Sequence, residues 1–139
     1  MTRRGFTSIE TVAALAMMAA LAAGGLSTIS SLSATLRLAA SARTLAQTMR
    51  ETRARALAEG RPLEVRFDAS THAWSIATPD GTIRRQEALP APVRFAALPA
   101  RARIRFDATG GAENGTIVLG TTAAVRRIVV NQRGRVRLA

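Results

Sequence analysis

Apolar side chains fill the start of the chain almost without interruption. Between positions 6 and 26 only Glu10 carries an ionisable side chain. A helix of about 21 residues, rising about 1.5 Å per residue, is roughly 32 Å long, enough to cross the hydrocarbon core of a bilayer. The pattern therefore predicts a membrane-spanning helix over residues 6–26.

Farther along, the apolar positions narrow to a stripe with the period of a helix. At about 100° per residue they fall within one arc, while Arg43 and Arg50 project away from it. Such a stripe predicts an amphipathic half of the helix over residues 27–60, lying on a globular body. The stripe consists of Leu38, Ala42, Leu45, Met49 and Ala56.

Glycine and proline residues mark where this helix should end or change. Gly60 and Pro62 form a stop signal, so one helix is expected from about Phe6 to Glu59. Gly24 and Gly25 are poor helix formers. They indicate either a bend or close packing against a neighbouring helix, and the sequence leaves both open.

After Pro62 the apolar period changes to two, which is the period of a β-strand. Pro79–Gly81 is typical of a turn, and Pro90, Pro92 and Pro99 confine their segment to an edge strand or a broken strand. Short alternating segments separated by turn residues predict antiparallel sheet. The fold class is therefore α+β, a long N-terminal helix packed on one or two small antiparallel sheets, with a β-rich domain over residues 61–139. The expected strands are LEVRFD, AWSIA, TIRRQ, PAPVRF, RIRFD, TIVLG, VRRIVVN and RVRL.

The position of Glu10 in an apolar segment needs a physical explanation. An acidic residue at the middle of a bilayer costs roughly 2.5–3.5 kcal/mol. A plain transmembrane anchor would need this carboxylate to reach the interface, and a cleaved secretory signal of the twin-arginine kind would have to accept it near its start. Arg3 and Arg4 precede the segment, which favours a cytoplasmic N-terminus and a body on the other side of the membrane.

The segment RRGFTSIE resembles the processing site of type IV pilin-like proteins. The resemblance implies a leader over residues 1–5, cleavage between Gly5 and Phe6 by a prepilin peptidase, and N-methylation of Phe6. It also implies that Glu10 meets the terminal amine of a neighbouring pilin subunit during assembly, and an opposite charge would make a carboxylate tolerable there. The resemblance further implies a single-pass inner-membrane protein, held by lipid with its C-terminal domain in the periplasm. It would later become part of a pilus or pseudopilus, with residues 6–26 in the filament core.

The order of the expected elements also resembles the FimT/GspH-type minor pilins and pseudopilins. The likeness is sharpest in the closing segments GTIVLG and RRIVVNQRGRVRLA. It implies a pilin-like fold over residues 61–139 together with the helix.

The sequence offers little for catalysis. His72 stands in a polar stretch typical of a surface turn, and Glu64 and Asp68 are expected on the outer side of one strand, solvated or paired with arginines. There is no cysteine and only one histidine, so a typical zinc site cannot be built. We expect no catalytic residues, no metal and no cofactor, and therefore no enzyme.

Charge is the strongest compositional signal. The chain has 20 basic residues, all arginine, against 9 acidic ones, for a net charge of +11. Near the C-terminus Arg133, Arg135 and Arg137 alternate with other residues, so on a strand they would share one face about 6.6 Å apart. Gly134 would let the chain turn sharply or approach a ligand closely.

The preceding expected strand carries Arg126 and Arg127, one of which would join this face if the two strands pair as a hairpin. No acidic residue follows Glu113. Like charges on one face repel, so the arginines are either simply solvated or have an anionic partner.

The stretch Gly134–Arg137 resembles the GRxR motif of FimT-type pilins from naturally competent bacteria. The resemblance implies that Arg135 and Arg137 contact the phosphate backbone of DNA. Two functions remain open. The first is a minor type IV pilin that captures extracellular DNA during natural transformation, and the second is a structural minor pseudopilin of a type II secretion system with no role in DNA binding.

Overall fold

The computed structural model describes residues 8–139, without the side chains of residues 22–30. The chain divides between Ser33 and Ala34 into two compact units. Gly5 and Phe6, the predicted processing site, lie outside the described residues. The described elements are α1 (Ser8–Glu59), β1 (Leu63–Asp68), β2 (Ala73–Ala77), β3 (Ile83–Ala88), β4 (Arg94–Ala97), β5 (Arg103–Phe106), β6 (Gly115–Gly120), β7 (Val125–Val130) and β8 (Val136–Leu138).

The helix α1 runs through Gly24 and Gly25 without a break in its hydrogen-bonded pattern. It ends where expected, because Gly60 adopts a left-handed φ of 61° and the Arg61 amide donates to the Ala56 carbonyl. Before position 22 its described side chains are exposed. Within the described residues, no helix is long and apolar enough to cross a membrane, so the structure does not confirm a membrane span over residues 6–26.

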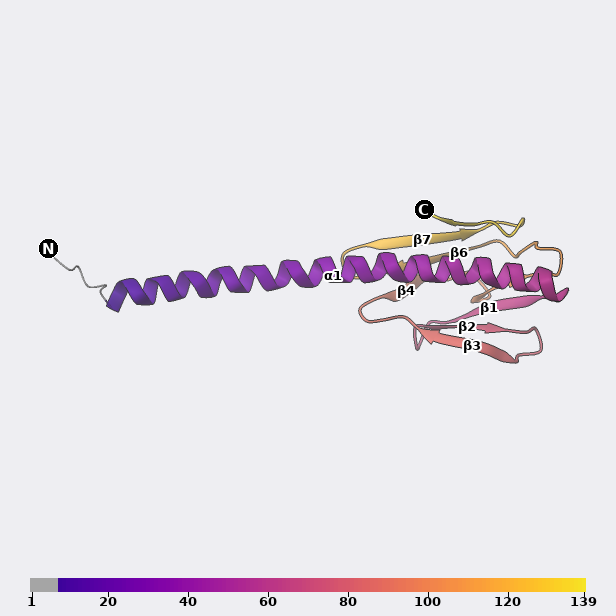
Figure 1. The fold of residues 1–139 in the computed structure, drawn as a ribbon, viewed down its shortest axis with the longest axis horizontal. Coiled ribbons are helices and arrows are strands. Elements are labelled where there is room, and N and C mark those ends of the chain that lie inside the picture. Colours follow the sequence, from indigo (N-terminus) through magenta and orange to yellow (C-terminus); the bar gives the residue numbers. More distant parts are fainter. Residues whose placement is uncertain (1–7) are drawn as a thin grey trace. The chain divides into compact units, whose positions relative to one another are not determined.

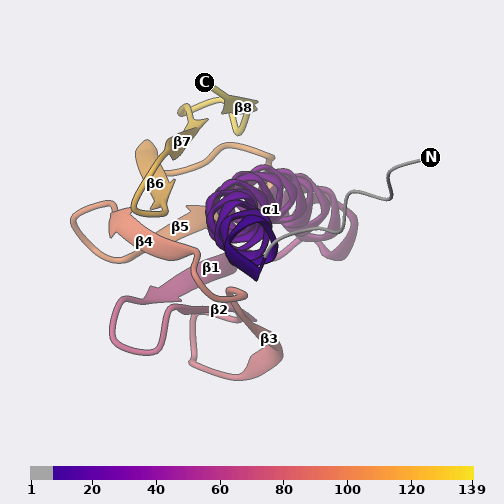
Figure 2. The same ribbon diagram turned by 90° about the vertical axis from the view of Figure 1, so that its left-hand side faces the viewer.

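The strands form two four-stranded antiparallel sheets in residues 34–139. Their orders are β3-β2-β1-β5 and β4-β6-β7-β8. Seen along the helix, the strands follow an arc on one side of α1, with β3 and β8 at its two ends (Figure 2). The proline-flanked strand β4 is an edge strand, as predicted, because proline cannot donate to a central ladder.

The C-terminal half of α1 lies alongside both sheets and closes one apolar core (Figure 1). The entire predicted stripe, from Leu38 to Ala56, is buried. The inward side chains of β1, Leu63, Val65 and Phe67, are buried as the alternation predicted. Each fully buried large apolar side chain contributes roughly 1.5–3 kcal/mol, so packing on the sheets stabilises this half of the helix.

Candidate functional site

The hairpin between β7 and β8 is closed by a tight turn at residues 131–135. The Asn131 side-chain Oδ1 accepts hydrogen bonds from the amides of Arg133, at 3.1 Å, and Arg135, at 2.9 Å. The Gly134 amide donates to the Asn131 carbonyl, and the Asn131 amide donates to the Arg135 carbonyl. With Gly134 at a φ of 71°, this is a three-residue hairpin loop with a glycine bulge.

The turn corrects the predicted row of three arginines on one strand. β8 begins only at Val136, so Arg137 lies on the strand while Arg133 and Arg135 belong to the turn. The physical reason is the left-handed Gly134, which interrupts the extended backbone that regular alternation requires. All three arginine side chains are nevertheless exposed.

Gly134 forms the sharp turn expected of it and is also buried against the rest of the body. A Cβ atom at this position would clash with the Gly110 carbonyl oxygen and the Arg53 Nε, and would lie 2.8 Å from the Arg53 Cδ. The missing side chain therefore makes room for Arg53 of α1. Arg53 uses that room to donate from Nε to the Gly110 carbonyl at 2.8 Å.

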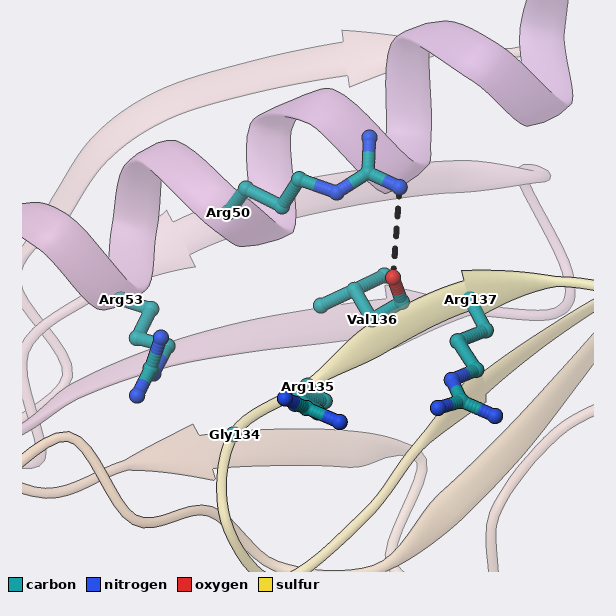
Figure 3. A pocket seen from close by; sticks show the side chains of 6 residues that line it. All are labelled: Arg50, Arg53, Gly134, Arg135, Val136 and Arg137. Carbon is teal, nitrogen blue, oxygen red and sulfur yellow. Dashed lines mark hydrogen bonds between the residues drawn. The ribbon is translucent and has the colours of Figure 1, made fainter.

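A second helix arginine reaches the same strand. The Arg50 Nη2 donates to the Val136 carbonyl at 3.2 Å. Arg50 and Arg53 are three residues apart and so share one face of the helix. With Arg135 and Arg137 they surround an open hollow of about 330 Å³ (Figure 3). We call these four residues the basic cluster.

The contribution of the helix to this site was missed by the sequence analysis. The sequence shows that Arg50 points away from the apolar stripe, but it does not show which strand lies on that side. The residues of β8 that lie near the helix are set by the register of β7 with β8. That register depends on the turn at residues 131–135. Only the three-dimensional arrangement brings positions 50 and 53 to positions 135 and 137.

The arginines of β7 divide between its two faces. Arg127 pairs through its backbone with Ala139, and Val129 lies opposite Arg137. Residues opposite each other share a face, so Arg127 lies on the same face as Arg137, about 7–8 Å away along the diagonal. Arg126 lies on the other face, so the prediction that one of these two arginines joins the row holds for Arg127.

The acidic side chains are engaged elsewhere. Within residues 8–139, none of the ion pairs involves an arginine of the basic cluster. The four paired acids contact arginines between positions 61 and 103. These acids are Glu59, Glu64, Glu87 and Glu113. The basic cluster therefore has no ion-paired carboxylate within residues 8–139.

The other titratable candidates have structural surroundings. Glu64 is only 1% exposed and pairs with Arg66 and Arg103 at 2.9 and 3.0 Å, so it is paired and buried and not solvated. Hydrogen bonds from Ser70 and Thr71 lower the pKa of Asp68 to about 2. In the described part of the chain no group of three His, Cys, Asp or Glu side chains could hold a metal ion.

His72 lies in the turn before β2, as predicted, but it is half-buried and its ring lies 6.3 Å from that of Phe95.

The fold defines a class, that of pilin-like proteins with a long N-terminal helix on small antiparallel sheets. The minor pseudopilin EpsH from the type 2 secretion system of Vibrio cholerae has this fold, with a TM-score of 0.62 and 17% identity over 74% of this chain and 96% of that chain. The type IV minor pilin FimU of Pseudomonas aeruginosa matches with a TM-score of 0.61 and 20% identity, over 73% of this chain and 87% of that chain. No curated protein gives a significant match.

The family itself follows from a second comparison. The family model of the type II transport protein GspH matches residues 41–134, more than half of the chain. The protein therefore belongs to the GspH family, which confirms the predicted FimT/GspH relationship and the α+β pilin-like fold.

Proposed function

We propose that this protein is a minor pilin or pseudopilin that enters a pilus or pseudopilus through the N-terminal part of α1. Membership of the GspH family supports this role. The exposed apolar side chains of that part, among them Ile9, Val12 and Leu21, offer a surface for the helices of other subunits. Residues 1–5 act as the leader, a prepilin peptidase cuts between Gly5 and Phe6, and inner-membrane lipid holds the helix before assembly.

Glu10 has the assembly role in this proposal. It lies in the first turn of α1 and is exposed. Pairing with the terminal ammonium of a neighbouring subunit offsets the free-energy cost of burying this carboxylate in an apolar filament core. The pair also fixes how far one helix slides along the next.

The body has a binding role in the same proposal, the capture of extracellular DNA through its arginines. The observation that carries it is the basic cluster, whose guanidinium groups have no acidic partner in the described residues. Guanidinium groups bind phosphate in a planar, bidentate geometry. Arg133 and Arg127 extend the positive surface beyond the cluster, and Arg126 adds charge on the other face of β7.

A binding measurement on the double variant Arg135→Gln/Arg137→Gln tests the DNA role. The full-length chain is kept in a non-ionic detergent, and the anisotropy of a fluorescein-labelled 20-base-pair duplex is followed. With about three to five phosphate contacts, log K should fall against log salt with a slope near −3 to −4.5. We expect the double variant to lose at least tenfold in affinity at low salt.

The matched control removes equal charge elsewhere. Arg55 and Arg94 are exposed and line none of the hollows around the hairpin. Arg55→Gln/Arg94→Gln should bind duplex nearly as well as the parent. Equal losses in the two double variants would mean that net charge alone drives binding.

In that case the second candidate function stands, a structural minor pseudopilin of a type II secretion system. The fold likeness to EpsH favours this candidate.

A further inference from the structure

We propose that Arg50 of α1 is itself a DNA contact, and that it holds one backbone phosphate together with Arg135 and Arg137. Arg53 is the positioning residue that fixes the hairpin beside the helix. This inference rests on the proposed DNA-binding function. It adds that the phosphate site is shared by the helix and the hairpin, whereas the GRxR-like stretch alone would form only a charged strand. We call this site the shared site.

The attachment of Arg50 points to a ligand site. Its Nη2 is held by the Val136 carbonyl, between Arg135 and Arg137 in the chain. That bond orients the guanidinium at the rim of the hollow, and its remaining N–H groups have no acceptor among the described residues (Figure 3). An arginine held in place loses less conformational entropy when a ligand binds.

The attachment of Arg53 explains how the hollow keeps its shape. Its Nε bonds the Gly110 carbonyl, and its stem fills the space that a side chain at position 134 would occupy. Helix, Gly110 loop and hairpin therefore meet at one side chain. We infer that the glycine of the GRVR stretch serves this contact, and that the phosphate is held by the arginines on both sides of it.

The chemistry of the hollow favours a phosphate group. Its lining has four guanidinium side chains, Gly134 and Val136, and no carboxylate. Several guanidinium groups around one open space repel one another unless an anion lies between them. A phosphate oxygen can accept from more than one of them in short, charge-assisted hydrogen bonds.

A comparison of DNA binding by the variants Arg50→Gln and Arg55→Gln distinguishes the shared site from a general effect of charge. Both remove one positive charge from an exposed position on α1, but only Arg50 lines the hollow. With the full-length chain in detergent and the same labelled duplex, Arg50→Gln should weaken binding about tenfold. It should also make the salt slope shallower by up to about 0.9, the share of one phosphate. Arg55→Gln should change neither quantity by more than twofold.

The results that overturn the inference differ from those that overturn the DNA role. If Arg50→Gln binds the duplex like Arg55→Gln while Arg135→Gln/Arg137→Gln loses binding, the shared site is wrong and the DNA role stands. If none of these variants differs from the parent, both are wrong.

A polyglutamate competitor of equal charge tests the ligand class. Its displacement of the duplex is compared with that by inorganic polyphosphate. The inference is also overturned if polyglutamate displaces the duplex as well as polyphosphate does, and if Arg50→Gln weakens the binding of both competitors equally. That result would identify an acidic protein surface as the partner.

The positioning role of Arg53 is tested by a measurement that distinguishes it from a simple loss of structure. Inorganic phosphate is titrated while the side-chain Nε–H signals of the arginines are followed by NMR. We expect shifts at Arg50, Arg135 and Arg137, and little change at Arg53, whose Nε–H is already bonded to Gly110. In Arg53→Lys the charge is kept, yet the phosphate-induced shifts at the other three should weaken at least threefold. Unchanged shifts in a folded Arg53→Lys protein would contradict the positioning role.

Discussion

At the scale of single residues, one glycine connects the turn, the helix and the basic cluster. Gly134 has a φ of 71°, and its missing side chain leaves space for Arg53. Gly60 has a similar φ of 61°, but a Cβ there would meet nothing within 4 Å. The two glycines share a backbone requirement and differ in packing, so they form a natural pair for comparison.

Gly134→Ala should be clearly more destabilising than Gly60→Ala. A left-handed φ costs a non-glycine residue about 1–2 kcal/mol, and both variants should show that loss. Gly134→Ala must also move Arg53 or the Gly110 carbonyl, so we expect a total loss of about 3 kcal/mol or more. Urea unfolding of residues 34–139, which contain the whole apolar core, measures both. Equal losses would show that the Arg53 contact does not depend on the glycine.

Residue identity alone predicted part of this site. A strongly basic C-terminus with a glycine between arginines is visible in the sequence, and the exposure of Arg135 and Arg137 agrees with it. The sharp turn at Gly134 was predicted, but its packing was not, because a positive φ can serve a turn, a ligand or a packed neighbour. Only the distance to Arg53, which is far away in the sequence, separates these possibilities.

At the scale of elements, an ion-paired group joins the end of α1 to β3. Glu59, the last residue of the helix, accepts hydrogen bonds from Arg84 at 2.7 and 2.9 Å and from Arg61 at 2.7 Å. The hydrogen bond from Arg84, followed by that from Arg61, lowers the pKa of Glu59 from 4.5 to about 2. This contact holds an exposed edge strand beside the helix.

The lowered pKa of Glu59 makes this contact sensitive to acid. Between about pH 4.5 and pH 2 the unfolded chain binds a proton at Glu59 that the folded chain does not. The stabilisation is therefore complete above about pH 4.5 and lost as the pH falls through 2. In urea unfolding, Glu59→Gln should be less stable than the parent at pH 7, and the difference should shrink toward pH 2. A constant difference across this range would contradict a role for the carboxylate charge.

The elements themselves followed the hydrophobic pattern closely. The stripe from Leu38 to Ala56 and the inward side chains of β1 were predicted and are buried as expected, because burial of apolar area dominates their placement. Glu64, expected on the outer side of β1, is buried as well. The extent of the last strand was predicted less well. Its length depends on the hydrogen bonds of Asn131, which the apolar pattern does not report.

At the scale of the whole molecule, the proposed assembly role and the proposed binding role fall on different parts of the chain. The first part of α1 exposes a run of apolar side chains from Ile9 to Leu21, and residues 34–139 carry the core and the basic cluster. A substitution can therefore affect one function and spare the other.

Glu10→Ala should reduce incorporation into filaments without changing DNA binding. The variant loses the carboxylate proposed to pair with a neighbouring subunit's terminal ammonium, while the basic cluster stays intact. We expect at least a fivefold drop of the protein in sheared filament fractions, measured against its total amount in the cells. Glu51→Ala is the control, since Glu51 is an exposed acid of the same helix that accepts a hydrogen bond from Gln47. Normal incorporation of Glu10→Ala would contradict the assembly role.

The uneven distribution of paired acids gives the body an electrical polarity. Arg66 of β1, Arg84 of β3 and Arg103 of β5 pair with neighbouring carboxylates, whereas the arginines around β8 have no ion pair within the described residues. Since β3 and β8 lie at opposite ends of the arc of strands (Figure 2), the body has a dipole whose positive end is the hairpin. A dipole turns in the field of a polyanion before the two surfaces touch. A larger share of the collisions between the body and a polyanion would then lead to binding. Added salt would lower the association rate more steeply than it raises the dissociation rate.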